Sequence, residues 1–431
     1  MNYSESLDYL KQLLTINSVK DTPKENAPFG IGVKHCLDVA LNILSKYGFK
    51  TKNIEGFCGY GEIGSGKLFG ILSHLDVVPV GKGWHYDPFG ATIENNKIYA
   101  RGALDDKSPF IAMLWALTEI LDEGLTPKMR IRFILGCDEE SGWGCIDRYV
   151  KTEEMPEIGI TPDADFPVIN CEKGIFHFNI VCDKNKNIIL ASAGDKANMV
   201  PDYAEIKITK NVNILPIKNN KTIQIIENEN DYTIISTGKS AHGSTPHKGE
   251  NAIVKLLKAI TTLSEFSEYI KLTSQIDDIK GAHANLDLSD DKSGHLSFNV
   301  GTMKTIEDKL VFEVDIRYPV TFEKDYILNT LKDNIAGEII ETHHQKPLYV
   351  DKDSFLVKTL LDSYNQVMNT NLEPISIGGG TYARALKCGV AFGPCFPNGN
   401  EGMHCPDEYM DLDDFKKMKE IYYVALKKLC F

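Results

Sequence analysis

Six side chains with the chemistry of metal ligands are distributed between residues 74 and 404 of the sequence. They belong to the motifs SHLDVV at 73–78, ARGALDDK at 100–107, CDEES at 137–141, TPDADFP at 161–167 and GMHC at 402–405, and they are His74, Asp105, Glu139, Glu140, Asp163 and His404. Two imidazoles, three carboxylates and one further glutamate are what a pair of divalent ions and a general base require. The sequence therefore predicts one metal centre assembled from distant segments.

His74 and Asp76 lie two residues apart after the apolar run 68–72, so on a strand both would face the same side. Asp76 could then accept a hydrogen bond from the ring nitrogen of His74 that does not bind metal, and so fix the tautomer of the ring. The alternative is a His–Asp hydrogen bond at a strand end with no metal.

Two acidic clusters follow expected strands. Asp105 and Asp106 lie between a strand and a helix, where a carboxylate reaches the mouth of an α/β sheet. The alternative, stronger for Asp106, is a helix N-cap followed by a first-turn acid. The three adjacent acids at 138–140 repel one another unless cations compensate them, and one can bind a metal while the next faces the substrate. The alternative there is a solvated acidic turn.

The remaining histidines give weaker signals. A lone histidine near a C-terminus, such as His404, is more often structural than a ligand. His343 and His344 are interpreted as surface residues because adjacent ligands point apart, and His35 as a structural residue within a helix.

The elements that must position these residues alternate between helices and strands. Helices are expected at 5–16, 31–47, 108–121 and 145–151, and strands at 58–63, 67–75, 92–99 and 129–136. This alternation predicts an α/β domain with a largely parallel sheet.

The amino-acid composition and the pattern of expected elements change near residue 175, and the first pattern resumes near residue 347. Residues 177–346 are richer in Lys, Asn and Asp, and they contain short alternating strands with helices at 251–263 and 323–335. We therefore expect one α/β domain formed by 1–175 and 347–431, with an α+β domain inserted over 176–346. The insert must loop out and return for His404 to meet His74.

Composition excludes several classes of protein. The chain has 431 residues, a net charge of −13 and a pI of about 5.4, which argue against a nucleic-acid partner. No signal peptide is visible and no run of 18 apolar residues occurs, so no membrane partner is expected. The ten cysteines contain no CxxC pair and are typical of a reduced, cytoplasmic protein.

One motif is misleading. GYGEIG at 59–64 matches GxGxxG, but a strand follows it where a dinucleotide site needs a helix, so an oxidoreductase is rejected. The sequence also lacks HExxH, a Walker loop and a GxSxG elbow.

Taken together and in order, the motifs resemble the bacterial dipeptidase V type of the di-zinc metallopeptidase family, over roughly residues 5–425. They are SHLDVVPVGKGW, ARGALDDKSP, GCDEESGW, TPDADFP, INCEKG, ANMVPD, STGKSAHGSTPHKGENA, VDIRYP, GGGTYAR and GMHCPDE. The family also holds carnosinases, aminoacylases, carboxypeptidase G-type enzymes and succinyl-diaminopimelate desuccinylase. The resemblance implies a zinc-peptidase-like catalytic domain with an inserted lid.

The resemblance also implies roles for the ligands. One divalent ion would be held by His74, Asp105 and Asp163, and the other by Asp105, Glu140 and His404. Asp105 and a water would bridge the two ions, and Glu139 would take the proton of that water. Zinc is the expected metal, with manganese or cobalt as alternatives. The peptide bond between Asp105 and Asp106 is cis in the family.

In the insert, the resemblance implies that His242 donates to the developing oxyanion. Asn198 and Arg317 would hold the polar ends of the substrate, and backbone amides at 378–380, including Gly379, would approach it. The alternative for Arg317 is a salt bridge at a strand edge. Ser108 departs from the family, which usually has Gly there. The insert of about 170 residues is longer than the lid of the dimeric relatives, and the resemblance implies a monomer that uses its own lid histidine.

The sequence therefore predicts a metal-dependent dipeptidase that cleaves dipeptides or short peptides by a metal-bridged water activated by Glu139. One alternative is an amidohydrolase that deacylates N-acyl amino acids. An alternative of another class is a non-catalytic relative that binds metal or peptide, although such a protein has no need of Glu139.

Overall fold

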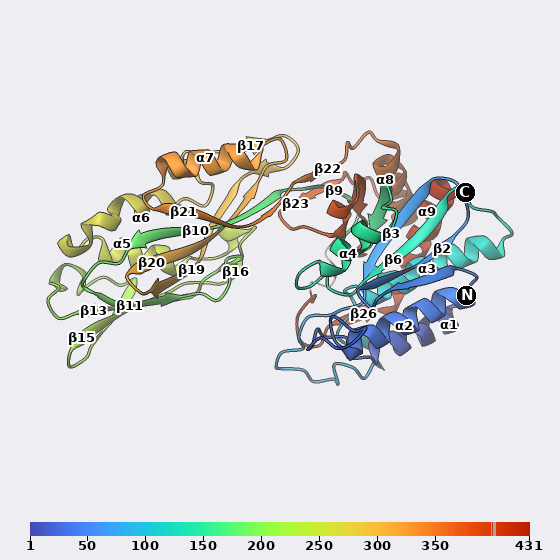
Figure 1. Cartoon of the computed structure of the whole chain (residues 1–431), viewed down its shortest axis with the longest axis horizontal. Helices are drawn as coiled ribbons and strands as arrows, with labels where there is room; N and C mark the ends of the chain where they lie inside the picture. Colours follow the sequence, from blue (N-terminus) through green and yellow to red (C-terminus); the bar gives the residue numbers. More distant parts are fainter. Residues whose placement is uncertain (398, 400–401) are drawn as a thin grey trace. The chain divides into compact units, whose positions relative to one another are not determined.

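The computed structural model describes residues 1–397, 399 and 402–431, and the chain divides into two compact units (Figure 1). Unit 1 consists of Met1–Asn170, Val350–Ile375 and Thr381–Phe431. Unit 2 consists of Cys171–Tyr349 and Ser376–Gly380. The segment 376–380 belongs to unit 2 because it packs there, at Gly378, against the side chain of Ser244.

Unit 1 is built on a mixed sheet. Its strand order is β1(Lys50–Ile54), β2(Cys58–Ile63), β6(Arg130–Gly136), β3(Leu68–His74), β7(Ile158–Thr161), β24(Cys388–Ala391) and β9(Ile169–Glu172). The neighbours β6, β3, β7 and β24 run parallel, whereas the flanking pairs are antiparallel. Every residue of β3 is buried, as expected for a parallel strand covered on both faces. The sheet predicted to be largely parallel is thus parallel at its centre and antiparallel at its flanks.

Helices cover this sheet. They are α1(Tyr3–Leu14), α2(Ile31–Lys46), α3(Lys107–Asp122), α4(Gly144–Thr152), α8(Phe355–Met368) and α9(Leu412–Cys430). Helix α3 is buried along almost its whole length and packs against α9 and α1 (Figure 1). Its rigid position matters because Asp105 and Asp106 lie directly before it.

The single strand expected over 92–99 is a hairpin. Strands β4(Thr92–Glu94) and β5(Lys97–Tyr99) pair, and β26(Tyr409–Asp411) adds to β5. Asn95 and Asn96 form the turn with φ of 48° and 60°, the left-handed pair that a tight hairpin requires. This pairing brings the chain near residue 409 beside the chain near residue 99.

Unit 2 has an antiparallel sheet of eight strands. The order is β14(Ile223–Glu227), β15(Asp231–Thr237), β13(Tyr203–Thr209), β11(Ile188–Ala193), β19(Ser297–Ile306), β20(Lys309–Tyr318), β10(Gly174–Asp183) and β21(Glu338–Gln345). Helices α5(Ala252–Ile260), α6(Ile270–Ile276) and α7(Lys324–Asn334) pack with it around one apolar core (Figure 1). The fold is therefore α/β with an inserted α+β unit, as the sequence predicted.

Short elements complete the chain. Two-residue strands pair as β25(Pro394–Cys395) with β8(Ala164–Asp165), β12(Met199–Val200) with β16(Ala241–His242), and β17(Ser289–Asp290) with β18(Gly294–His295). Strands β22(Leu348–Tyr349) and β23(Ile375–Ile377) pair with β9. The short helices are η1(Leu215–Ile217), η2(Pro246–Lys248), η3(Ser264–Tyr269), η4(Ala282–Ala284) and η5(Tyr382–Ala385). Among the residues described, no helix combines the length and the apolar composition needed to cross a membrane.

Candidate metal centre and active site

Three parallel strands deliver most of the predicted ligands to one edge of the unit 1 sheet. His74 is the last residue of β3, and β6 ends at Gly136, just before the acids at 138–140. Strand β7 ends at Thr161, two residues before Asp163. Because β6, β3 and β7 are parallel neighbours, their carboxyl ends lie together, where sites of α/β proteins form.

Asp105 lies between two imidazoles. Its Oδ1 lies 2.8 Å from Nε2 of His74, and its Oδ2 lies 2.8 Å from Nε2 of His404. The other two acids approach the same rings: Asp163 Oδ2 is 3.6 Å from His74 Nε2, and Glu140 Oε1 is 3.2 Å from His404 Nε2. The structure thus brings residues 74, 105, 140, 163 and 404 together.

Glu139 belongs to the same cluster. Its carboxylate, with His74 and Asp163, forms a group whose ligand atoms all lie within 4.8 Å of one another, and His74, Asp105 and Glu140 form a second such group. His74 and Asp105 are buried, with exposed fractions of 0% and 7%, whereas the side chain of His404 is 52% exposed. In unit 1 the cluster is therefore open on the side of His404.

An excess of acid dominates the electrostatics. Burial, reinforced by Asp105, raises the pKa of Asp163 to about 7, and burial with Asp163 raises the pKa of Glu139 well above its usual value. Contacts with Asp105 and Glu140 raise the pKa of His404 to about 11. Burial opposes ionisation of Asp105, but His74 and His404 together lower its pKa below the usual value.

Asp106 is not the helix cap that its position suggests. It occupies the N-cap position of α3, but its side chain makes no capping hydrogen bond. Its Oδ2 accepts from the backbone N–H of His74, and its Oδ1 is buried with no partner. The peptide bond between Asp105 and Asp106 is cis, as the resemblance implied.

The side chain of Asp76 has a different partner from the expected one. The Nδ1 atom of His74 lies 2.9 Å from the backbone oxygen of Asp76, and 3.7 Å from its carboxylate. The carboxylate instead accepts from the backbone N–H groups of Glu139 and Glu140, at 3.0 and 3.1 Å. Because these two amides adjoin β6, Asp76 orients the acidic turn rather than the imidazole.

A buried ion pair joins two of the ligand loops and is not visible as a pair in the sequence. Arg101 Nη1 donates to Glu408 Oε2 at 2.6 Å, and Arg101 Nη2 donates to the backbone oxygen of His404 at 3.3 Å. Glu408 Oε1 accepts from the backbone N–H groups of Leu104 and Asp105. Both charged side chains are almost fully buried. The pair therefore holds the Asp105 loop beside the His404 loop.

Trp143 is a third residue whose position sequence reasoning missed, after Arg101 and Glu408. Its indole Nε1–H donates to Glu139 Oε1 at 3.2 Å. In the sequence it stands out only as a neighbour of two glycines after the acidic turn.

The residues predicted in the insert gather within unit 2. Strand β12 pairs with β16, so Met199 lies opposite His242 and Asn198 lies beside that pair, where its backbone oxygen accepts from the N–H of Gly243 at 2.7 Å. Arg317 donates through Nη1 to the backbone oxygen of Gly378, next to Gly379. A Cβ on Gly378 would come within 2.7 Å of the Ser244 side chain, so the glycine permits this close approach.

Arg317 also forms a salt bridge, although not at a strand edge, because β20 is paired on both sides with β19 and β10. Its Nε and Nη2 atoms donate to the two carboxylate oxygens of Asp315 at 2.7 and 2.9 Å. Burial opposes ionisation of Asp315, but Arg317 lowers the pKa of the carboxyl below its usual value. The guanidinium is thus fixed in direction, because Nε, Nη1 and Nη2 each donate a hydrogen bond.

His242 is arranged as a neutral donor. The backbone N–H of Ser244 donates to His242 Nδ1 at 3.1 Å, and Ser244 Oγ lies 2.7 Å from the same atom, so the backbone contact favours the tautomer with the ring proton on Nε2. Burial, with a contribution from Arg317, lowers the pKa of His242. The Nε2–H group can therefore donate a hydrogen bond at neutral pH.

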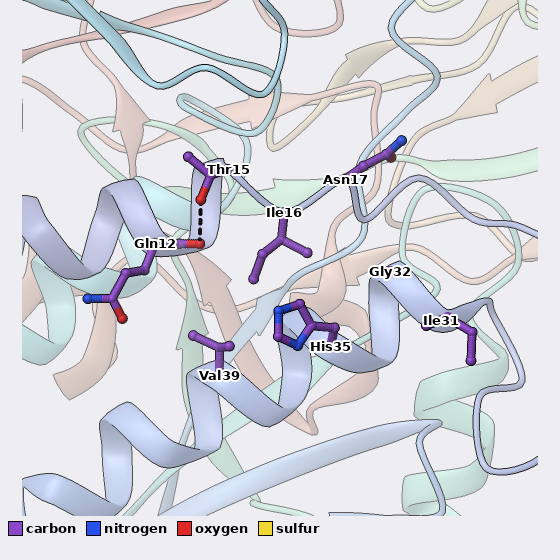
Figure 2. A pocket seen from close by; sticks show the side chains of 8 residues that line it. All are labelled: Gln12, Thr15, Ile16, Asn17, Ile31, Gly32, His35 and Val39. Atoms are coloured by element: carbon purple, nitrogen blue, oxygen red, sulfur yellow. Dashed lines mark hydrogen bonds between the residues drawn. The ribbon is translucent and has the colours of Figure 1, made fainter.

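A separate hollow of about 560 Å³ lies in unit 1 where α1 ends and α2 begins (Figure 2). It is lined by Gln12, Thr15, Ile16, Asn17, Ile31, Gly32, His35 and Val39. His35 is exposed on α2. No metal-ligand cluster of the kind described above contains any of these residues within the part of the chain that the structure describes.

The amino-acid sequence matches a known protein family and a named relative. Residues 70–428 match the family described as Peptidase family M20/M25/M40. The chain is 40% identical over 445 residues to the Bacillus subtilis (strain 168) protein named "Putative dipeptidase YtjP", covering 97% of this chain and 96% of that one.

Two solved structures share the fold. An M20 family metallo-carboxypeptidase from Sulfolobus solfataricus has a TM-score of 0.59 at 20% identity, covering 99% of both chains. The aminoacylhistidine dipeptidase from Vibrio alginolyticus has a TM-score of 0.59 at 14% identity, covering 99% of this chain and 96% of that one.

Proposed function

Because the chain belongs to peptidase family M20/M25/M40 and is a metal-dependent peptidase, we propose that it cleaves dipeptides at a centre of two divalent ions. The observation that carries the proposal is the position of Asp105, whose two carboxylate oxygens each lie 2.8 Å from a different imidazole. We further propose that unit 1 is the catalytic domain and unit 2 the lid domain.

The residues fit a pair of divalent ions. Five carboxylates, belonging to residues 105, 106, 139, 140 and 163, share this region with only two imidazoles. One oxygen of Asp106 is buried without a partner. Uncompensated negative charge in a buried site is costly, and bound cations remove that cost. Imidazole nitrogen and carboxylate oxygen are ligands that zinc, manganese and cobalt accept, and we propose zinc.

We assign His74, Asp105 and Asp163 to one ion, and Asp105, Glu140 and His404 to the other. When bound, such ions polarise the scissile carbonyl and lower the pKa of water. Asp76 holds the backbone of the acidic turn, so that Glu140 and Glu139 point in different directions. Glu139 accepts a proton from the attacking water and later delivers it to the leaving amine.

We propose that the insert supplies the groups that bind the substrate. The neutral His242 ring, with its proton on Nε2, donates to the oxygen that becomes negative during attack. Arg317, held by Asp315, offers N–H groups to the C-terminal carboxylate, and Asn198 and Gly379 offer further polar contacts. A small substrate with a free carboxylate, such as a dipeptide, suits this set.

We also propose that the protein acts as a cytoplasmic monomer. The insert carries its own histidine, and all ten cysteines are free thiols, which favours a reducing compartment. Light scattering that gives a dimer mass at assay concentrations would contradict the monomer.

The function is tested with purified protein that is stripped of metal and reloaded with zinc, manganese or cobalt. We expect hydrolysis of members of a dipeptide panel, at rates well above those for an N-acyl amino acid panel. Faster hydrolysis of N-acyl amino acids would establish the amidohydrolase instead. Binding of metal and peptide without turnover under any metal would identify a non-catalytic relative.

A further inference from the structure

We propose that Trp143 is a positioning residue for Glu139, a role that rests on the function proposed above. Its indole Nε1–H donates to Glu139 Oε1 at 3.2 Å. Because this contact holds Oε1 against the indole, it orients the carboxylate and favours Oε2 as the oxygen that exchanges the proton. The indole therefore determines which face of the carboxylate meets the reacting water.

The backbone of Trp143 is held in an uncommon conformation. Its φ is 60°, in the left-handed region that bulky residues rarely adopt. Its N–H donates to the backbone oxygen of Asp138 at 2.7 Å. The Asp138 carboxylate accepts from the N–H of Gly144 at 3.1 Å and from Lys20 Nζ at 2.6 Å. These backbone contacts thus hold the indole toward Glu139. A change of this backbone to a more common conformation would turn the indole away from that carboxylate.

The ring itself is also fixed. Trp143 meets Tyr382 edge to face, with ring centroids 5.2 Å apart at 73°. Tyr382 is fully buried, and its hydroxyl contacts Cys145 Sγ at 2.8 Å. The indole therefore packs against a buried and rigidly held ring.

The two ends of Glu139 are consequently held by different residues. Asp76 accepts from its backbone N–H at 3.0 Å, and Trp143 donates to its carboxylate. A general base attached through a flexible side chain needs such support, because small misplacements of a reacting group reduce rates strongly. The contact serves the base and not the ligands, so it should affect turnover and not metal binding.

The first test compares substitutions that remove or keep the donor. Trp143→Phe keeps an aromatic ring against Tyr382 but lacks the N–H. We expect kcat to fall by about tenfold or more, the size expected for one hydrogen bond to a charged group. KM and the metal content per chain should stay at wild-type values. Trp143→His should recover part of kcat, because Nε2 of an imidazole lies as many bonds from Cβ as Nε1 of an indole.

The control is Trp115→Phe, which removes a tryptophan in α3 whose ring contacts Tyr3 and Phe415. This variant should keep wild-type kcat. Wild-type kcat in Trp143→Phe, or a fall in kcat that accompanies loss of metal, would overturn the positioning role. Equal activities of the Phe and His variants at position 143 would overturn it as well.

A double-mutant cycle isolates the pathway through Glu139. If Trp143 acts only through that carboxylate, Trp143→Phe should cause no further loss in a Glu139→Gln background. Additive losses would show that the indole acts by another route.

A fluorescence measurement tests the contact without any substrate. The chain has three tryptophans, so the wild-type spectrum minus that of Trp143→Phe isolates the emission of Trp143. Glu139→Ala should shift this isolated emission, measured by the same subtraction in the Ala background. An unchanged emission would refute the contact. If the wild-type protein cleaves no peptide with any metal, the proposed function fails, whereas the fluorescence result still decides the contact.

Discussion

The carboxylate of Asp105 contacts two imidazoles that lie 330 positions apart in the sequence, through a different oxygen in each case. One residue therefore serves both halves of the proposed metal centre. At the scale of single residues, the proposed site separates groups that bind cations from groups that transfer protons or donate hydrogen bonds. A separate prediction follows for each of these groups.

Asp105→Ala should release both ions together, because one carboxylate supports both and its loss increases their mutual repulsion. Metal analysis by mass spectrometry after gel filtration measures this. Asp163→Ala, which removes a ligand of only one proposed ion, is the matched comparison and should retain the other ion. Two equivalents still bound to Asp105→Ala would reduce Asp105 to a structural residue.

Glu139→Gln should lower kcat by about 10²–10⁴, the usual contribution of a general base, while both ions stay bound. The amide keeps the size of the side chain but cannot take up the proton. Steady-state kinetics with parallel metal analysis tests the role. Turnover near the wild-type rate would leave Glu139 as a ligand, a position that its distance to His74 and Asp163 also allows.

His242→Ala should lower kcat by about 10²–10³, the loss typical of one donor to a developing oxyanion, without changing metal content. Mixing this variant with Glu139→Gln chains distinguishes a monomer from a dimer that shares histidines. No recovery of activity is expected for a monomer. Recovered activity in the mixture would mean that the histidine is supplied by another chain.

At the scale of elements, the parallel strands β6, β3 and β7 bring three ligand segments to one edge, but the His404 segment needs a separate attachment. The pairing of β26 with β5 provides it, and the buried pair of Arg101 and Glu408 fastens the loops on either side. The residues that hold the His404 segment in place are therefore not themselves proposed metal ligands.

Glu408→Gln should therefore weaken metal binding and lower the stability of the folded protein. Removing one partner of a buried ion pair costs about 3–5 kcal/mol, because the other charge remains buried without compensation. Thermal unfolding and metal titration measure the two effects. Asp353→Asn is the control, since the exposed Lys358–Asp353 pair should contribute less than about 1 kcal/mol. Equal effects of the two substitutions would show that the buried pair has no special role.

At the scale of the whole molecule, the two units divide the residues of the proposed site between them. The proposed metal ligands all belong to unit 1, whereas His242 and Arg317 belong to unit 2. A bound metal ion stabilises the part of the protein that binds it.

Removal of metal by a chelator should consequently speed amide hydrogen exchange in unit 1, above all in the loops at 73–76, 104–107 and 138–144. Exchange in β19 and β20 of unit 2 should stay the same, because those strands lie in a core of their own. Mass spectrometry of peptides reads both regions in one experiment. An equal increase in both units would show that the metals stabilise the chain as a whole.

The sequence by itself determined the fold class and the residues that assemble. Apolar runs that end at His74, or just before Asp138, predict buried strands with polar residues at their ends, and parallel strands collect those ends at one edge. This signal is local in the sequence, so it can be recognised without knowing which elements pack against each other. The alternation of elements and the change of composition near residue 175 likewise predicted an α/β fold with an insert.

Only the tertiary structure decided which side chain holds which. The carboxylate of Asp76 binds the amides of the acidic turn, the indole of Trp143 reaches Glu139, and Arg101 meets Glu408 from 307 positions away. The hairpin at 92–99 likewise replaced an expected strand, because Asn95 and Asn96 adopt left-handed conformations. These contacts depend on directions and distances of a few ångströms between packed elements. Periodicity and motif spacing indicate which face of an element a residue occupies, but they do not indicate which residue of another element it contacts.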